Sequence, residues 1–249
     1  MTTQSRTTHR PVVAAWRIGW VVVTVCVVQG LVSGLSFVPI LLLWSVLIER
    51  TATGSVLRLV AVSLAVAPSY VLFSVLLMVF SALATRLTGW RTPINAELRI
   101  TDLSWPLLNW VRYMVAIHLV RFVAGGLFRG SPIWTAYLRL NGARLGRRVY
   151  VNSLALSDHN MLEFGDDVVI GGDVHISGHT VERGIVKTGT VRLGDQVTIG
   201  LETVVNIDVK IGSRTQVGAL SLVPKHSELD GDAVYVGVPV KRLDPRKSP

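Results

Sequence analysis

The chain has 249 residues, of which half are hydrophobic and only 16% are charged, and its mean hydropathy is +0.48. This composition excludes an ordinary soluble domain and predicts that part of the chain lies in lipid. The net charge of +9 suits either nucleic acid or an anionic membrane surface, and the hydropathy favours the membrane. The single cysteine, Cys26, lies in an apolar run and so excludes a disulfide framework.

Two long apolar runs follow a short basic N-terminus. Residues 18–48 contain no charge, and this run is far longer than the apolar region of a signal peptide. We therefore expect a retained transmembrane helix, bent or broken near Gly34 and Pro39. Residues 59–85 form a second uncharged run, long enough for a second span.

Two spans make a hairpin whose ends share one side of the membrane. Six arginines flank it, and they outnumber Arg50 and Arg58 in the turn: Arg6, Arg10 and Arg17 before it, and Arg86, Arg91 and Arg99 after it. Because cytoplasmic flanks are enriched in positive charge, we expect a multi-pass protein of the inner membrane with both ends in the cytoplasm.

Residues 105–128 are apolar but carry Arg112 and Arg121. We expect short helices at the membrane interface, anchored by Trp105 and Trp110, with the arginines reaching lipid phosphates. The sequence leaves open whether this segment spans the membrane or lies on it. Arginines then gather just before the next region, where we expect a basic collar against anionic lipid: Arg139, Arg144, Arg147 and Arg148.

From Phe164 to Tyr235 a large apolar residue returns every six positions. The series is Phe164, Ile170 and Ile176, then Leu193, Ile199, Val205, Ile211, Val217, Val223, Leu229 and Tyr235. A period of six fits neither a helix nor one exposed strand. It predicts short strands joined by tight turns, with one bulky residue inward per strand and glycine at the corners, stacked into coils around an apolar column.

This repeat closely resembles the hexapeptide-repeat acyltransferases, whose fold is a left-handed parallel β-helix of triangular section. Residues 236–242 also resemble their closing "G-x-P-x-K" signature. The resemblance implies acyl-CoA, such as acetyl-CoA or succinyl-CoA, as the donor, bound in a groove between subunits of a homotrimer. Residues 130–149 further resemble the membrane-attached terminal region of poly-lysine-synthetase-type non-ribosomal peptide synthetases, although this sequence carries no adenylation or carrier domain.

The predicted fold is membrane α plus all-β, in three parts. Residues 1–89 form the N-terminal transmembrane hairpin, residues 90–142 form interfacial helices and a connector, and residues 143–249 form the left-handed β-helix. We expect no nucleic-acid partner.

The repeat breaks between Ile176 and Leu193, where the spacing is 17 rather than six. About eleven extra residues therefore leave one corner as a loop, residues 178–190. In the resembling enzymes a corner loop carries the catalytic histidine, and His179 fits that role as a general base. Glu182 either orients its imidazole, as an "H-x-x-E" pattern implies, or pairs with Arg183. The alternative is that His179 caps a turn and the loop braces a neighbouring subunit.

A second break lies between Val151 and Phe164, which are 13 apart instead of 12. Stacking would bring this turn to the same edge as His179, so either Asp158 or His159 is a candidate partner for the imidazole, and a plain Asx turn is the alternative. Candidates for donor binding lie on the late coils: Gly200, Gly218, Ala219, Ser221, Lys225, Lys241 and Arg242. No two histidines lie at zinc-ligand spacing with a carboxylate or thiol between them, so no metal site is predicted.

The function that the sequence favours is a membrane-anchored acyltransferase. It would move an acetyl- or succinyl-type group from acyl-CoA to a hydroxyl or amine of a cell-envelope glycan, lipid or peptide. Two alternatives remain: a non-catalytic β-helical scaffold that docks a partner enzyme at the membrane, and an amide-bond-forming domain of the non-ribosomal peptide type.

Overall fold

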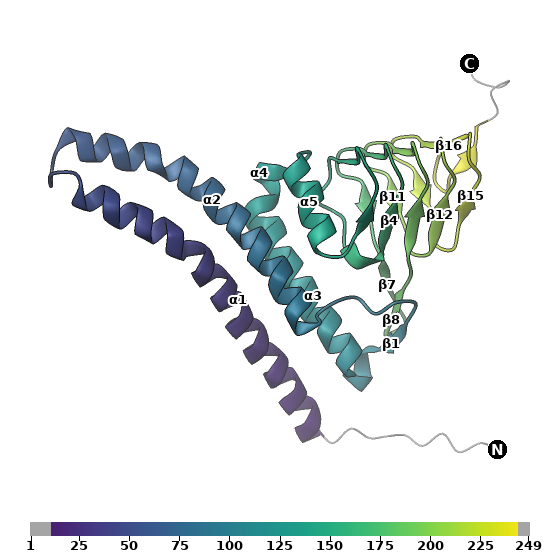
Figure 1. Ribbon diagram of the computed structural model, residues 1–249. Helices are drawn as coiled ribbons and strands as arrows, with labels where there is room; N and C mark the ends of the chain where they lie inside the picture. Colours follow the sequence, from purple (N-terminus) through teal and green to yellow (C-terminus); the bar gives the residue numbers. More distant parts are fainter. Residues whose placement is uncertain (1–10, 244–249) are drawn as a thin grey trace.

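A computed structural model of the protein describes residues 11–243, so Arg6 and Arg10 of the charge argument lie outside the described residues. A group of helices stands beside a β-helix (Figure 1). The helical segments are α1 (Pro11–Glu49), α2 (Val56–Thr88), α3 (Trp105–Val120), a π-helical turn (Arg121–Gly125), α4 (Gly126–Phe128) and α5 (Pro132–Leu140), with 3₁₀ turns at Ile100–Asp102 and His159–Met161.

Helices α1 and α2 pack against each other as a hairpin (Figure 1). Helix α1 has no break at Gly34 or Pro39, and it curves along its length (Figure 1), so of the expected bend or break only the break is absent. Proline removes one backbone hydrogen bond, and a long apolar helix tolerates that loss because its other bonds remain. Three segments are long and apolar enough to cross a membrane: Val12–Glu49, Val56–Thr88 and Trp105–Phe128.

The third of these segments differs from the short helices that we expected. Residues 105–128 form one continuous helical segment, which packs along α2. Its Arg112 does not reach outward: it is 3% exposed and donates to Thr24 Oγ1 at 3.0 Å and to Asn109 Oδ1 at 2.9 Å. The prediction that this arginine reaches a lipid phosphate was therefore wrong, because nearby polar atoms accept most of the hydrogen bonds of its guanidinium inside the protein.

The strands after residue 143 form the three faces of a parallel β-helix. Face 1 holds β2 (Arg144–Leu145), β4 (Leu162–Phe164), β9 (Val191–Leu193), β12 (Val209–Ile211) and β15 (Glu228–Leu229). Face 2 holds β3 (Tyr150–Val151), β5 (Val169–Ile170), β10 (Thr198–Ile199), β13 (Gln216–Val217), β16 (Val234–Val236) and the antiparallel β17 (Lys241–Arg242). Face 3 holds β6 (His175–Ile176), β11 (Val204–Val205) and β14 (Leu222–Val223).

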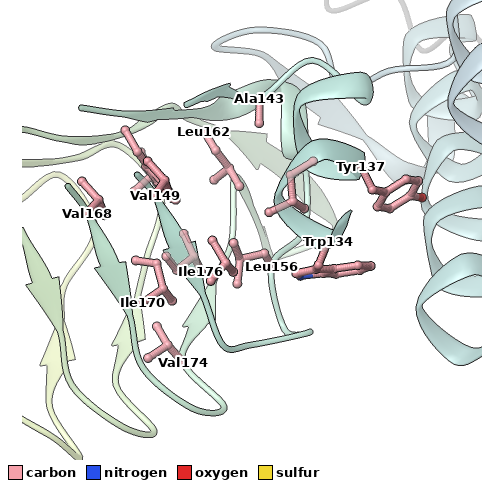
Figure 2. Packing of buried hydrophobic residues seen from close by; sticks show 14 of the residues in the cluster. Trp134, Tyr137, Ala143, Val149, Leu156, Leu162, Val168, Ile170, Val174 and Ile176 are labelled. Atoms are coloured by element: carbon pink, nitrogen blue, oxygen red, sulfur yellow. The ribbon is translucent and has the colours of Figure 1, made fainter. Parts of the chain in front are cut away.

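The residues at the period of six form the buried column that the sequence predicts. On face 2 the register places Val151, Ile170, Ile199, Val217 and Tyr235 above one another, and all are buried. Burying one such aliphatic side chain contributes about 1.5–3 kcal/mol. Figure 2 shows the column continuing from Ile170 and Ile176 past Leu156 to Trp134 of α5, so this helix covers the end of the coil next to the other helices.

Glycines stand at the corners, as the sequence predicts, but a positive φ does not explain them. The left-handed corner positions are occupied by other residues, among them Asp173 (φ 52°) and Glu202 (φ 54°). A Cβ at Gly200 would lie 2.5 Å from the Ala219 nitrogen of the next coil. The stacked coils approach too closely for a side chain there, and this contact, rather than a positive φ, requires glycine.

The predicted basic collar is paired with acidic residues of the following coil. Ion pairs join Arg144 to Glu163 at 2.9 Å, Arg147 to Asp166 at 2.8 Å and Arg148 to Asp167 at 2.6 Å. Arg139 donates instead to the Gly146 carbonyl at 2.6 Å. Each carboxylate is only one coil away, so these arginines are paired within the β-helix, and their contact with anionic lipid stays a prediction.

The inward phase of the repeat can be tested at neighbouring positions. Ile199→Asp places a carboxylate in the column, where Ile199 is fully buried, and we expect a loss of several kcal/mol of unfolding free energy. Thr198→Asp, at the adjacent half-buried position outside the column, should have a mild effect. Thermal unfolding in detergent measures both, and equal melting temperatures would contradict the assigned phase.

Candidate active site

The expected corner loop is a β-hairpin. Strands β7 (His179–Glu182) and β8 (Ile185–Thr188) pair antiparallel, and a two-residue turn at Arg183 and Gly184 joins them. Both turn residues have positive φ, 49° and 76°, as the type I′ hairpin turn requires. At the base, the Gly189 N–H donates to the Gly178 carbonyl at 2.9 Å.

A third strand from the same chain holds this hairpin. Strand β1 (Glu97–Arg99), in the link between α2 and α3, pairs antiparallel with β8. The Ala96 N–H donates to Thr188 Oγ1 at 2.9 Å, and that hydroxyl donates to the Pro93 carbonyl at 2.7 Å. The hairpin is therefore held within its own chain, because the link before α3 pairs with it along a full strand.

His179, the first residue of β7, contacts the carboxylate of Asp158. Its Nδ1 lies 2.5 Å from Asp158 Oδ2. Asp158 comes from the second break in the repeat, has a φ of 53° and is fully buried. Gly178 makes this approach possible, since a Cβ there would lie 2.7 Å from Asp158 Cβ. The structure therefore brings together two of the four catalytic candidates.

Two residues from the helical side hold the other oxygen of this carboxylate. Thr92 Oγ1 donates to Asp158 Oδ1 at 2.6 Å, and Trp110 Nε1 of α3 donates to it at 3.1 Å. Burial alone would raise the pKa of Asp158, but the hydrogen bonds from His179, Thr92 and Trp110 outweigh it and hold the pKa below its ordinary value. The carboxylate is therefore ionised at neutral pH.

The imidazole of His179 is fixed on one side and open on the other. The edge of the Trp110 ring packs against it with ring centroids 5.0 Å apart, and Ser177 Oγ accepts from the His179 N–H at 3.2 Å. The His179 side chain is 24% exposed. Within residues 11–243 no group hydrogen-bonds to Nε2, so this nitrogen is available to a reactant.

The other two catalytic candidates lie elsewhere. Glu182 is bound to Lys225 of the last coils and lies 3.7 Å from Lys187, so it contacts neither His179 nor Arg183. The hydrogen bond from Lys225 lowers the pKa of Glu182. His159 is 2% exposed, and its Nε2 lies 3.2 Å from the Leu156 carbonyl. It points into the protein because the turn after Asp158 is a 3₁₀ turn.

The donor-binding candidates fall on two corners that border face 3. Gly200, Gly218 and Ala219 lie at the corner between faces 2 and 3, and Lys241 pairs in register with Val236 beside that corner. Lys225 lies at the other corner, next to the hairpin. Two further candidates already have partners within the chain. Arg242 faces Asp230 at 3.9 Å, and Ser221 is 2% exposed and accepts from the Gly237 N–H inside the coil.

Two site residues escaped the sequence analysis. Thr92 lies in a link without any periodic pattern, so no signal in one sequence could find it. Trp110 was interpreted as a lipid anchor, and the structure corrects this, since its indole N–H bonds to Asp158. Among the described residues, no group of three or more His, Cys, Asp or Glu side chains is placed to hold a metal ion.

Comparisons with known proteins agree with the predicted resemblances. No protein-family model matches the chain. The chain is 24% identical over 111 residues to delta-poly-L-ornithine synthetase of Acinetobacter baumannii, covering 45% of this chain and 8% of the synthetase. It is 31% identical over 118 residues to galactoside O-acetyltransferase of Escherichia coli, covering 44% of this chain and 56% of that enzyme. The chain thus spans only part of the length of either relative.

Two solved structures are also similar to part of the chain. A hexapeptide-repeat acetyltransferase of Vibrio cholerae complexed with acetyl coenzyme A is 24% identical, with a TM-score of 0.37, over 43% of this chain and 62% of that chain. A galactoside acetyltransferase in complex with coenzyme A is 23% identical, with a TM-score of 0.38, over 45% of this chain and 69% of that chain. The resemblance to the hexapeptide-repeat acyltransferases is confirmed by the similarity to galactoside O-acetyltransferase.

Burial of His159 predicts a specific loss of stability in acid. Desolvation lowers its pKa from 6.5 to about 4 in the folded chain. Between these values the unfolded chain binds a proton that the folded chain does not, so stability is lost as the pH falls from 6.5 towards 4, by up to about 3 kcal/mol.

His159→Gln should remove this part of the acid sensitivity. Thermal unfolding at about pH 7 and about pH 4.5 measures it, and the melting temperature of the variant should fall less than that of the natural protein. Equal decreases in the two proteins would contradict the assignment.

Proposed function

We propose that the protein is a membrane-anchored, acyl-CoA-dependent acyltransferase in which His179 is the general base. The contact between His179 and the buried Asp158, with Nε2 left open, is the observation that supports this most directly. An imidazole held through Nδ1 by a carboxylate keeps its proton there and presents Nε2 as the acceptor. Similarity to acetyltransferases over the β-helix agrees with this chemistry.

The proposed reaction is a direct transfer. His179 Nε2 removes the proton from an acceptor hydroxyl or amine as that group attacks the thioester carbon. A carbon–oxygen or carbon–nitrogen bond forms, the carbon–sulfur bond breaks, and the proton passes from Nε2 to the leaving thiolate, so that acylated acceptor and free CoA result. Asp158 stabilises the imidazolium that exists between the two proton transfers.

The donor is proposed to lie across the outward-pointing side chains of face 3. His179 borders this face on one side, and the corner at Gly200, Gly218 and Ala219 borders it on the other. The outward residues of the face are in register: His175, Val204 and Leu222. Lys225, Lys241 and Arg242 are the cations proposed for the phosphates of CoA, whereas the buried Ser221 is left out.

The α1–α2 hairpin is proposed as the membrane anchor, with the β-helix on the cytoplasmic side. Large apolar residues of α1 remain exposed along its whole length, from Val12 to Ile48. The segment that begins with α3 contacts the first coil from Trp110, at Asp158, to Gly125, at Leu154. These contacts extend over 15 residues, about 22 Å of helix, so a segment that follows a polar coil this far lies at the interface instead of crossing the bilayer.

The acceptor is proposed to be a hydroxyl or amine of a cell-envelope glycan, lipid or peptide, and the transferred group to be of the acetyl or succinyl type. Amide-bond formation between amino acids is a second candidate, favoured by the similarity to delta-poly-L-ornithine synthetase. In that case the attacking group is an amine, and His179 has the same task. Mass spectrometry of envelope components from cells that lack the protein distinguishes the two through a missing acyl mass or a missing peptide product.

The assembly is proposed to be a homotrimer around an axis normal to the bilayer. Its support is an apolar ridge at the corner between faces 2 and 3, where Leu201, Leu220 and Val238 are 49%, 65% and 70% exposed. Exposed apolar ridges of this kind mark interfaces. Because the ridge adjoins Gly200 and Gly218, a neighbouring chain would also close the donor groove.

Replacing the base tests the proposal. His179→Ala should lower CoA release from acetyl-CoA in the presence of acceptor by about 10²–10⁴-fold without unfolding the coil. His226→Ala is the matched control, because His226 is exposed at a late corner and pairs with Asp208. Full turnover by purified His179→Ala protein would refute the assignment.

The assembly is tested by native mass spectrometry in detergent. We expect a trimer, and Leu220→Glu should shift it towards the monomer, because three copies of the charge would be buried at the contact. Tyr150→Glu, at an exposed position away from the ridge, is the control. A monomeric natural protein that binds acyl-CoA with full affinity would exclude both the trimer and the shared groove.

A further inference from the structure

A cavity of about 400 Å³ lies where α2 ends, between the link at residues 89–94 and the first coil. Three arginines line it: Arg86, Arg91 and Arg144. No carboxylate is among its lining residues. The cavity is therefore electropositive, and it is separate from His179, which does not line it.

The cations at this cavity are only partly paired, and Arg86 donates to the Arg139 carbonyl at 3.3 Å. Arg144 pairs with Glu163, but within residues 11–243 neither Arg86 nor Arg91 forms an ion pair. Tyr113 also lines the cavity, and its hydroxyl is buried without a hydrogen-bond partner among the described residues. Two guanidinium groups without a carboxylate partner suit a ligand with a negative charge and several acceptor oxygens, which describes a phosphate group.

The surroundings indicate that this phosphate belongs to a lipid. Leu87 and Ile94, on either side of Arg91, are 78% and 66% exposed, so apolar surface adjoins the cations. Trp16, Trp20 and Trp105 lie together near the start of α1, and tryptophans of this kind gather at headgroup level. We infer that this cavity binds the phosphate of an anionic lipid headgroup through Arg86 and Arg91.

An occupant of this cavity would touch the residues that position Asp158. Arg91 precedes Thr92, whose hydroxyl donates to Asp158. Asn160 lines the cavity, accepts from the Thr92 N–H at 3.2 Å and donates to the Thr92 carbonyl at 2.8 Å. Lipid binding therefore stiffens the link that carries Thr92 and β1, and with it the hairpin of His179. This inference concerns binding and does not require transfer activity.

The test uses the full chain purified in detergent with three probes: dihexanoyl phosphatidylglycerol, inorganic phosphate, and dihexanoylglycerol, which lacks the phosphate. Native mass spectrometry measures binding, and hydrogen exchange follows residues 92–99 and 179–188. The double variant Arg86→Gln/Arg91→Gln removes the two cations without a carboxylate partner. Arg50→Gln/Arg99→Gln is the matched control, because both of its arginines are exposed and neither lines the cavity.

Phosphatidylglycerol should bind the natural protein and slow hydrogen exchange in both segments. The cavity variant should bind it at least about tenfold more weakly, a loss of about 1.4 kcal/mol. The control variant should bind it as tightly as the natural protein does. Equal binding of dihexanoylglycerol, or equal weakening in both variants, would overturn the phosphate site. Inorganic phosphate bound as tightly as the lipid would overturn the lipid as its occupant. Binding without slower exchange would overturn the link to the hairpin.

Discussion

The arrangement of the site depends on one buried charge, the carboxylate of Asp158. It is fully buried, and three donors satisfy it: His179 from the hairpin, Thr92 from the link and Trp110 from α3. Removing one partner from a buried ion costs about 3–5 kcal/mol, so the three elements are held in place together. The position of the imidazole is therefore set by the helical part of the chain as much as by the β-helix.

This constraint makes the two parts of the molecule one functional unit. The β-helix alone supplies Asp158 and His179, but the two other donors to Asp158, Thr92 and Trp110, come from residues before the first coil. The link that carries Thr92 also supplies β1, which completes the hairpin sheet, and α5 covers the end of the buried column. In the proposed function, the segment between the membrane anchor and the β-helix therefore completes the site, since it carries Thr92 and Trp110.

Patterns of short period were readable from the sequence. The spacing of six predicted the buried column, and its two breaks located the segments that meet at His179 and Asp158. Contacts between distant segments were not readable. Thr92 has no pattern, Trp110 looks like any interfacial tryptophan, and the pairing of Arg147 with Asp166 becomes visible only when coils stack. The reason for the corner glycines was not readable either, because it is the close approach of the neighbouring coil and not the local backbone conformation.

The most direct test of this account is the turnover of Thr92→Val, a change that keeps the shape of the side chain and removes one hydrogen bond to Asp158. Thr180→Val, on β7 beside His179, is the matched control. A hydrogen bond to a charged group contributes about 1.5–3 kcal/mol, so we predict that kcat falls by about 10- to 100-fold with KM for acyl-CoA unchanged, and that the control keeps its rate. An unchanged kcat for folded Thr92→Val would show that the helical part of the chain does not position the site.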